Sequence, residues 1–183
     1  MAISRAELES YAGRTIPDVV PNDLRLLFVG INPGLVSAAT GMHFARPGNR
    51  FYPALRLAGI LPEDVLTPEA AAPVLLARGI GITNIVARAS ARADELDDAE
   101  LVEGRARLEA FVAEHRPRVV AIAGITSYRI AFAEKKARPG RQDRTLSDAQ
   151  VWVVPNPSGL NAHETVASLA QAYREAARAA GIV

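Results

Sequence analysis

Four short apolar runs along the chain predict the strands of a sheet. They are residues 24–30 (LRLLFVG), 80–86 (IGITNIV), 118–124 (RVVAIAG) and 150–155 (QVWVVP). None shows the apolar–polar alternation of a half-exposed strand, which indicates burial on both faces, as in parallel sheets. We therefore expect a central sheet of four mostly parallel strands.

Segments with helical features lie between these runs and predict the layers that cover the sheet. Residues 67–77 begin with Thr as an N-cap followed by Pro68, and residues 98–116 carry one apolar face before Pro117. Further helices are expected within 1–23 and over 49–59, 126–134 and 164–180. Strands that alternate with helices predict one domain over residues 1–183, a three-layer α/β/α sandwich.

Two connections stand out among those expected to lack regular structure. Residues 31–49 are long and rich in Gly, Pro, Ser and Asn, and residues 156–163 contain a second Asn-Pro turn. Polar residues 87–97 and charged residues 135–148 form the other long connections. The two unusual connections follow the first and fourth predicted strands, and ligands of open α/β sheets bind beyond the carboxyl ends of strands. A candidate site is therefore expected where they meet.

Composition restricts the chemistry available to this site. The chain has no Cys, which excludes disulfides, thiol catalysis and Cys-ligated iron–sulfur clusters. His43, His115 and His163 lack metal-ligand spacing, so we expect no metal and no other cofactor. Of the 21 basic residues all but Lys135 and Lys136 are Arg, which leaves few residues for Schiff-base chemistry. Arg suits forked phosphate contacts, although a codon bias toward Arg and Ala is the favoured explanation for the excess of Arg over Lys.

The net charge of +1 neither favours nor excludes a nucleic-acid partner. No apolar run reaches the roughly 18 residues needed to span a bilayer. Residues 1–14 are charged and lack the apolar centre of a secretory signal. We therefore expect a cytoplasmic monomer that does not bind membranes.

The two unusual connections carry a resemblance to a known family. GINPGLVSAATG at 30–41, followed by HFARPGNRFY at 43–52, resembles the first motif of the mismatch-specific uracil/thymine-DNA glycosylases. NPSGLNAH at 156–163 resembles their second motif. Either turn alone is ordinary, but the spacing between them also matches, so the resemblance covers nearly the whole chain. General uracil-DNA glycosylases differ in having Asp in place of Asn32.

The resemblance implies a uracil-DNA glycosylase-like fold and a monofunctional enzyme of base excision repair. Such an enzyme binds double-stranded DNA, flips uracil out of a mismatch and hydrolyses its N-glycosidic bond. Thymine and other damaged pyrimidines are further candidate substrates. Two other hypotheses stay open, a lesion sensor that flips bases without cleaving and a Rossmann-like nucleotide-binding module. The second lacks support, since the chain has no GxGxxG and no phosphate-loop Lys.

The resemblance assigns to Asn32 the role of holding the hydrolytic water. An amide is not a strong base, so the rate would come from positioning and from stabilising the leaving group. Asp94 lies at the same rim and is a second, less favoured catalytic candidate that would assist this water. The alternative is that Asp94, like Asp97 and Asp98, caps or charges the N-terminus of the following helix.

A set of residues around the first motif and the second strand is expected to bind the flipped base. These residues are Ile31, Gly34, Ser37, His43, Phe44 and Asn84. Phe44 would stack on the base, with core packing as the alternative. Backbone amides near Gly34 and Ser37 would hold the pyrimidine. Asn84 can both donate and accept hydrogen bonds, or it simply ends a strand.

The second motif is expected to contact the DNA duplex. Leu160 would be the wedge that fills the hole left by the base, and the alternative is that it packs on the closing helix as a hydrophobic staple. Ser158, Gly159 and Asn161 complete its loop, while Arg46, Arg50 and His163 are expected to contact phosphates. Ala162 stands where some relatives have Arg, so readout of the unpaired guanine is expected to use backbone groups.

Overall fold

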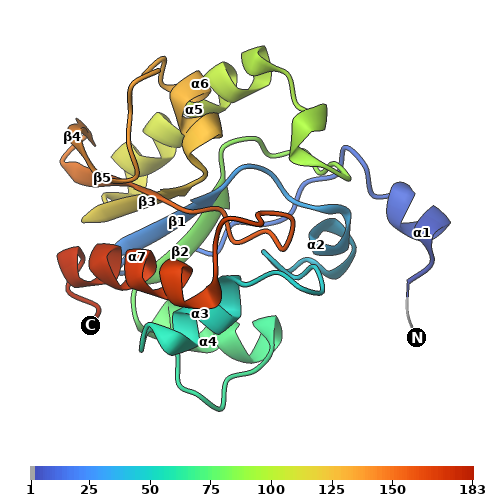
Figure 1. Cartoon of the computed structure of the whole chain (residues 1–183), viewed down its shortest axis with the longest axis horizontal. Helices are drawn as coiled ribbons and strands as arrows, with labels where there is room; N and C mark the ends of the chain where they lie inside the picture. Colours follow the sequence, from blue (N-terminus) through green and yellow to red (C-terminus); the bar gives the residue numbers. More distant parts are fainter. Residues whose placement is uncertain (1–2) are drawn as a thin grey trace.

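The computed structural model describes residues 3–183 and shows a five-stranded sheet between two layers of helices (Figure 1). The strand order is β2-β1-β3-β5-β4. Four strands run parallel and β4 pairs with β5 in the antiparallel direction. The strands are β1 (Leu26–Gly30), β2 (Ile80–Asn84), β3 (Val119–Ala123), β4 (Gly140–Leu146) and β5 (Ala149–Val154). The predicted α/β/α fold class is confirmed.

The edge strand β4 corrects the prediction of a four-stranded sheet. The charged loop expected over residues 135–148 is wrong for Gly140–Leu146, which form a strand. This strand (GRQDRTL) contains one buried residue, Leu146, and its polar side chains alternate between partly buried and exposed. Charged side chains are a common protection of sheet edges against unwanted pairing. Apolar periodicity therefore could not identify it.

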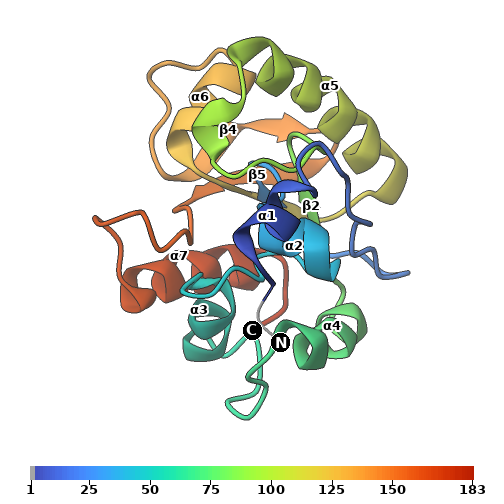
Figure 2. The same cartoon turned by 90° about the vertical axis from the view of Figure 1, so that its right-hand side faces the viewer.

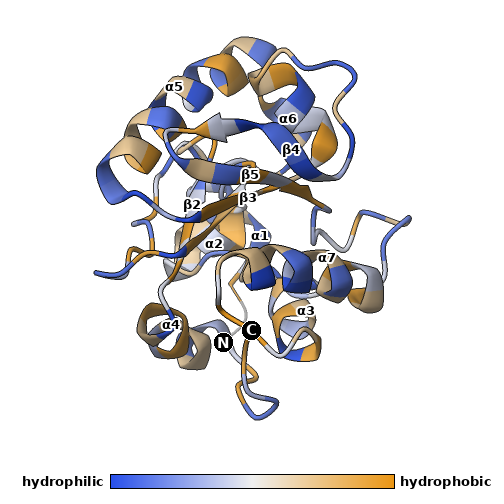
Figure 3. Ribbon diagram, turned by 90° about the vertical axis from the view of Figure 1, so that its left-hand side faces the viewer, coloured by the Kyte–Doolittle hydropathy of each residue, from blue (hydrophilic) through white to orange (hydrophobic). Residues whose placement is uncertain are grey.

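Two helical layers cover the sheet, as Figures 2 and 3 show from opposite sides. One layer contains α5 (Asp98–His115) and α6 (Ile125–Ala131), which pack on each other. The other contains α3 (Phe51–Leu57), α4 (Pro68–Ala77) and α7 (Val166–Ala179), in which α3 packs on α7. Each of these helices had been predicted with small differences at its ends. In residues 3–183 no helix combines the length and apolarity needed to cross a bilayer.

Strand β1 shows why the apolar runs do not alternate between apolar and polar residues. All five of its residues are buried, because its side chains enter the cores on both faces of the sheet. Leu26 and Phe28 face α3 and α7, while Leu27 and Val29 face α5 and α6. The Phe28 ring meets Phe51 edge-on with centroids 5.2 Å apart. Burying one such side chain contributes about 1.5–3 kcal/mol.

Two short helices lie in segments for which the sequence predicted no helix boundaries. Helix α1 (Arg5–Glu9) lies within the N-terminal region expected to hold a helix, and α2 (Leu35–Thr40) lies inside the connection expected to be irregular. Gly34 is the N-cap of α2 and Gly41 ends it in the left-handed conformation, with φ of 72°. Helix α2 packs on α1, and both lie at the edge of the sheet where the strands end (Figure 2).

Candidate active site

The loops after β1, β2 and β5 meet at the carboxyl edge of the sheet and enclose a cavity of about 130 Å³. Gly30 and Asn84 are register partners, so β1 and β2 end side by side. The volume corresponds to about four water molecules, which suits a single planar ring. Its lining includes Gly30, Ile31, Asn32, Gly34, Ser37, His43, Phe44, Arg46, Asn84, Ser90, Asn156 and Ser158. The structure thus brings the two motifs and the six expected base-binding residues to one place.

The side-chain amide of Asn32 has a fixed orientation. Its Nδ2 donates to the carbonyl of Arg88 at 3.0 Å and to the hydroxyl of Ser90 at 2.8 Å. Because a backbone carbonyl only accepts, the nitrogen of the amide has to face Arg88. Both amide protons are then used. The Oδ1 oxygen remains as the atom through which Asn32 can accept a hydrogen bond from a water in the cavity.

Ser90 was missed by the sequence analysis. Its side chain is 2% exposed and its hydroxyl donates to the carbonyl of Arg92 at 2.6 Å, so the oxygen faces Asn32 as an acceptor. Its backbone also bridges to Gly34. Ser90 lies in a polar connection with no motif of its own, and no local pattern in the sequence marked it.

Asn84 is oriented by His43. His43 Nε2 lies 2.9 Å from the carbonyl of Pro17, to which it can only donate, so Nε2 carries the proton of the neutral ring. Its Nδ1 then accepts from Asn84 Nδ2 at 3.2 Å. Burial lowers the pKa of His43, against opposing effects of the Pro17 hydrogen bond and of the Asp18 charge. The neutral ring therefore holds Asn84 with its carbonyl oxygen turned toward Gly30 and the cavity.

Gly30 leaves the space that the side-chain amide of Asn84 occupies. A Cβ atom at Gly30 would lie 2.5 Å from Asn84 Oδ1 and 3.2 Å from Cζ of Phe44. Any side chain at this position would therefore displace one of them. Gly30 was expected to end the first strand and begin the first motif, and this contact with Asn84 was not predicted.

Phe44 has an unusual backbone and a stacked ring. Its φ is 56°, a left-handed conformation that non-glycine residues rarely adopt. The ring stacks on Phe51 with centroids 4.1 Å apart and planes inclined by 25°. Phe44 also lines the cavity. The ring therefore packs against the core and borders the site, so the two interpretations of Phe44 are compatible.

The loop of the second motif is held by its own hydrogen bonds. Asn156 Oδ1 accepts from the backbone nitrogen of Ser158 at 3.0 Å, and Asn161 Nδ2 donates to the carbonyl of Asn156 at 3.2 Å. Leu160 is 71% exposed and belongs to neither hydrophobic core cluster. The N-cap of α7 is Thr165, which forms a capping box with Ser168.

The three residues expected to contact phosphates differ in whether their side chains are exposed or bound to the protein. Arg46 and His163 are exposed at the rim. Arg50 instead points inward, and its guanidinium donates to the carbonyls of Ser158, Asn161 and Glu164. Arg46 is therefore an accessible cation next to the cavity, and the His163 side chain is exposed at the rim.

A wider groove of about 650 Å³ adjoins the cavity and shares Ile31, Arg46, Asn156 and Ser158 with it. Leu160, His163 and Asp94 line the groove. Asp94 lies in the 3-10 helix Ala93–Glu95, its side chain is 63% exposed, and it forms an ion pair with Arg92. The N-cap of α5 is Asp97.

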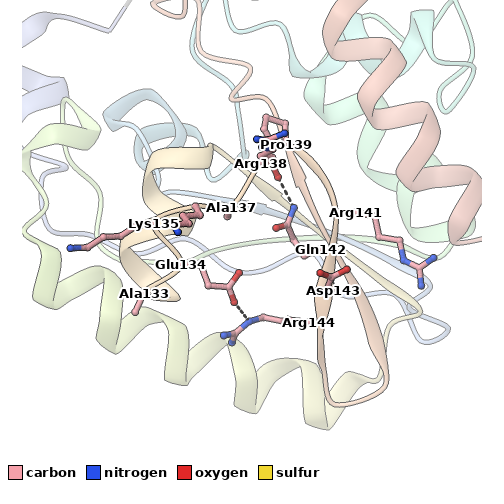
Figure 4. Close-up of a pocket in the computed structure, with 11 residues that line it drawn as sticks. Ala133, Glu134, Lys135, Ala137, Arg138, Pro139, Arg141, Gln142, Asp143 and Arg144 are labelled. Carbon is pink, nitrogen blue, oxygen red and sulfur yellow. Dashed lines mark hydrogen bonds and ion pairs between the residues drawn. The ribbon is translucent and has the colours of Figure 1, made fainter.

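A further hollow, of about 790 Å³, lies apart from both motifs, along the connection from α6 to β4 and the start of β4 (Figure 4). It is lined by residues 133–144 except Gly140. Its charges include Lys135, Lys136 and Arg141, and the Glu134 carboxylate pairs with Arg144 at 2.5 Å. Among residues 3–183, no group of three or more His, Asp or Glu side chains is placed to hold a metal ion.

Parallel strands that end at one ring-sized cavity define an α/β domain with its ligand site at the carboxyl edge of the sheet. A family model described as the uracil DNA glycosylase superfamily matches residues 17–179, so the chain belongs to this superfamily. A solved structure from Methanosarcina acetivorans, a protein provisionally assigned as a uracil DNA glycosylase, has the same fold with a TM-score of 0.58. The two chains are 16% identical over 88% of this chain and 98% of the other.

Proposed function

We propose that the protein is a monofunctional DNA glycosylase that removes uracil from mismatched double-stranded DNA. Thymine and other damaged pyrimidines are further candidate substrates. One observation carries the proposal: the oriented amides of Asn32 and Asn84 and the ring of Phe44 line a single cavity, with Leu160 exposed on the adjoining loop.

Access to the glycosidic bond requires the base to leave the duplex. Unstacking and unpairing it takes a few kcal/mol, least where the base is already mismatched. Leu160 would enter the vacated space as an apolar wedge. The flipped ring would lie against Phe44, and stacking on an aromatic side chain contributes about 1–3 kcal/mol. Arg46 and His163, exposed at the rim, would contact backbone phosphates.

Asn84 would read the edge of the base. Its carbonyl oxygen faces the cavity, and its amide nitrogen is held by His43. The carbonyl can accept the N3–H of uracil or thymine. Cytosine has no proton on N3, so the same geometry disfavours cytosine at that atom.

Hydrolysis would use a water held by Asn32 Oδ1. The water oxygen bonds to C1′ of the deoxyribose as the C1′–N1 bond breaks, through a state with oxocarbenium character. The bonding pair leaves with uracil as an anion, which nearby backbone amides stabilise. The proton of the attacking water passes to solvent. Lys135 and Lys136 lie in the connection after α6 and not at the cavity, so no lysine is placed to form a covalent intermediate there.

Alkaline cleavage of a labelled G·U duplex after incubation tests the proposal. Strand breaks with wild-type protein that form about 100-fold more slowly with Asn32→Ala identify a glycosylase. A shifted but intact duplex identifies a lesion sensor, and the absence of both effects favours a binding module for small molecules. Rates on G·U compared with A·U duplexes measure mismatch preference, and a panel of thymine and ethenocytosine substrates measures the range.

A further inference from the structure

We propose that Arg50 is a positioning residue that holds the Leu160 loop, residues 156–164, and so controls how efficiently the base is flipped. The inference rests on the proposed glycosylase function. It replaces the expectation that Arg50 contacts a DNA phosphate. The two roles predict different effects of mutation. Loss of a loop clamp impairs base flipping before hydrolysis, whereas loss of a phosphate contact changes the salt dependence of DNA binding.

The hydrogen bonds of Arg50 bracket Leu160. Its Nη2 donates to the carbonyl of Ser158 at 2.5 Å and to that of Asn161 at 2.8 Å, on either side of the leucine. Its Nη1 donates to the carbonyl of Glu164, where the loop joins α7. One guanidinium thus contacts the loop at three points.

A backbone contact reinforces the clamp. The backbone nitrogen of Arg50 donates to the carbonyl of Pro157 at 3.0 Å. A Cβ atom added to Gly159 would lie 2.8 Å from the carbonyl oxygen of Gly48, so the segment before Arg50 and the Leu160 loop touch directly. The first motif therefore positions the second through its own last residues.

The loop needs such a clamp because its leucine provides no anchor. Because Leu160 is 71% exposed, its burial contributes little to holding the loop in place. Turn carbonyls left without donors favour other loop conformations. An Arg fork supplies several donors in a rigid plane, whereas Lys has a single flexible ammonium group. A loop ordered before binding loses less entropy when the wedge inserts.

The guanidinium is also poorly placed to bind phosphate. Its Nε nitrogen is shielded from solvent, and two of its nitrogens are engaged by protein carbonyls. Within residues 3–183 it forms no ion pair with a carboxylate. Its contacts are thus to the loop backbone. Arg46, exposed at the rim, offers the matched comparison for a phosphate contact.

The test compares Arg50→Met, Arg50→Lys and Arg46→Met in single-turnover excision of uracil. Two duplexes are used, one with G opposite uracil and one with a bulky pyrene nucleotide, which expels the uracil without help from a wedge. We expect both Arg50 variants to lose about ten- to hundredfold on G·U, the range for hydrogen bonds to a charged group. Their loss on the pyrene duplex should stay within about threefold. Arg46→Met should instead reduce the salt slope of DNA binding by about one, and the Arg50 variants should not.

Several outcomes would overturn the proposal. They are an Arg50→Lys variant with wild-type activity, an equal loss on both duplexes, or a salt slope reduced by about one in Arg50→Met. Arg50→Met should also add little to Leu160→Ala, because both would disable the same step.

A measurement without DNA separates this proposal from the proposed function. Backbone hydrogen exchange at Leu160 and Asn161, which donate within the turn, should be faster by about tenfold in Arg50→Lys than in wild type. Unchanged exchange overturns the clamp even if the protein is an active glycosylase. Wild-type protein that cleaves neither duplex overturns the glycosylase proposal, while the exchange result still decides whether Arg50 orders the loop.

Discussion

Asn32 and Ser90, 58 positions apart in the chain, are joined by a hydrogen bond of 2.8 Å from the Asn32 amide to the Ser90 hydroxyl. The carbonyl of Arg88 accepts the other amide proton at 3.0 Å. These two acceptors leave only the Oδ1 oxygen of Asn32 available to a water. The connection after β2 therefore fixes the orientation of this side chain of the first motif.

Ser90→Ala should lower kcat by about threefold to tenfold and leave KM nearly unchanged, since a hydrogen bond of this kind contributes about 0.5–1.5 kcal/mol. The amide of Asn32 would keep one of its two partners and lose part of its orientation. Single-turnover excision from a G·U duplex measures the effect. In an Asn32→Ala background, Ser90→Ala should have almost no further effect. Additive losses would show that Ser90 acts elsewhere.

Asn32→Ala should reduce excision about 100-fold, because positioning of the water is lost, while Asn32→Asp should retain or raise it by supplying a carboxylate base. One oxygen of the new carboxylate would face the carbonyl oxygen of Arg88. Because two acceptors repel each other, the protonated form is favoured and the pKa of the carboxyl group should be raised. Excision by Asn32→Asp should therefore increase with pH over the titration of that group. A rate–pH profile measured against wild type tests this, and a full rate for Asn32→Ala would refute the assignment of Asn32.

Acidification should destabilise the protein through His43. Because burial lowers the pKa of the folded-state imidazole below its ordinary value of 6.5, the unfolded chain binds a proton first as the pH falls. Stability is thus fully present above pH 6.5 and decreases below it, by up to about 1.4 kcal/mol per pH unit, until the folded-state pKa is reached. Urea unfolding followed by the fluorescence of Trp152, the only tryptophan, measures this.

His43→Gln provides the control for the acid effect. It should be less stable than wild type at pH 7.5 and should lose less stability between pH 7.5 and 5. Equal pH dependence in the two proteins would mean that another group is responsible. Protonated His43 would carry hydrogens on both nitrogens and could no longer accept from Asn84. Excision of uracil should therefore also decline over the acid range in which His43 titrates.

Gly104→Ala should destabilise the fold by about 1–3 kcal/mol, the usual result of overpacking. A Cβ atom at Gly104, in the middle of α5, would overlap the carbonyl oxygen of Ile85. Ile85 follows Asn84 directly, so excision should weaken as well. Glu103→Ala, at an exposed neighbouring position, should change stability by no more than about 0.5 kcal/mol. Equal thermal unfolding of the two variants would argue against the close contact.

Much of the architecture could be predicted because burial on both faces of a parallel sheet makes a strand apolar throughout. β1, β2, β3 and β5 were found in this way, and the caps Thr67 and Pro68 located the start of α4. β4 escaped because an edge strand needs polar side chains, and α2 escaped because six residues are too few to show a helical period. The two motifs were recognisable because their residues are adjacent in the chain.

The amino-acid sequence by itself determined where the buried strands lie, which two turns follow them, and which residue types border the candidate site. Only the tertiary structure decided which atoms of those residues face the cavity. Asn32 is hydrogen-bonded to Ser90, Asn84 to His43, and the Leu160 loop to Arg50. The physical reason is that a hydrogen bond between residues tens of positions apart leaves no periodicity in the chain. It exists only after the sheet has brought the ends of its strands together.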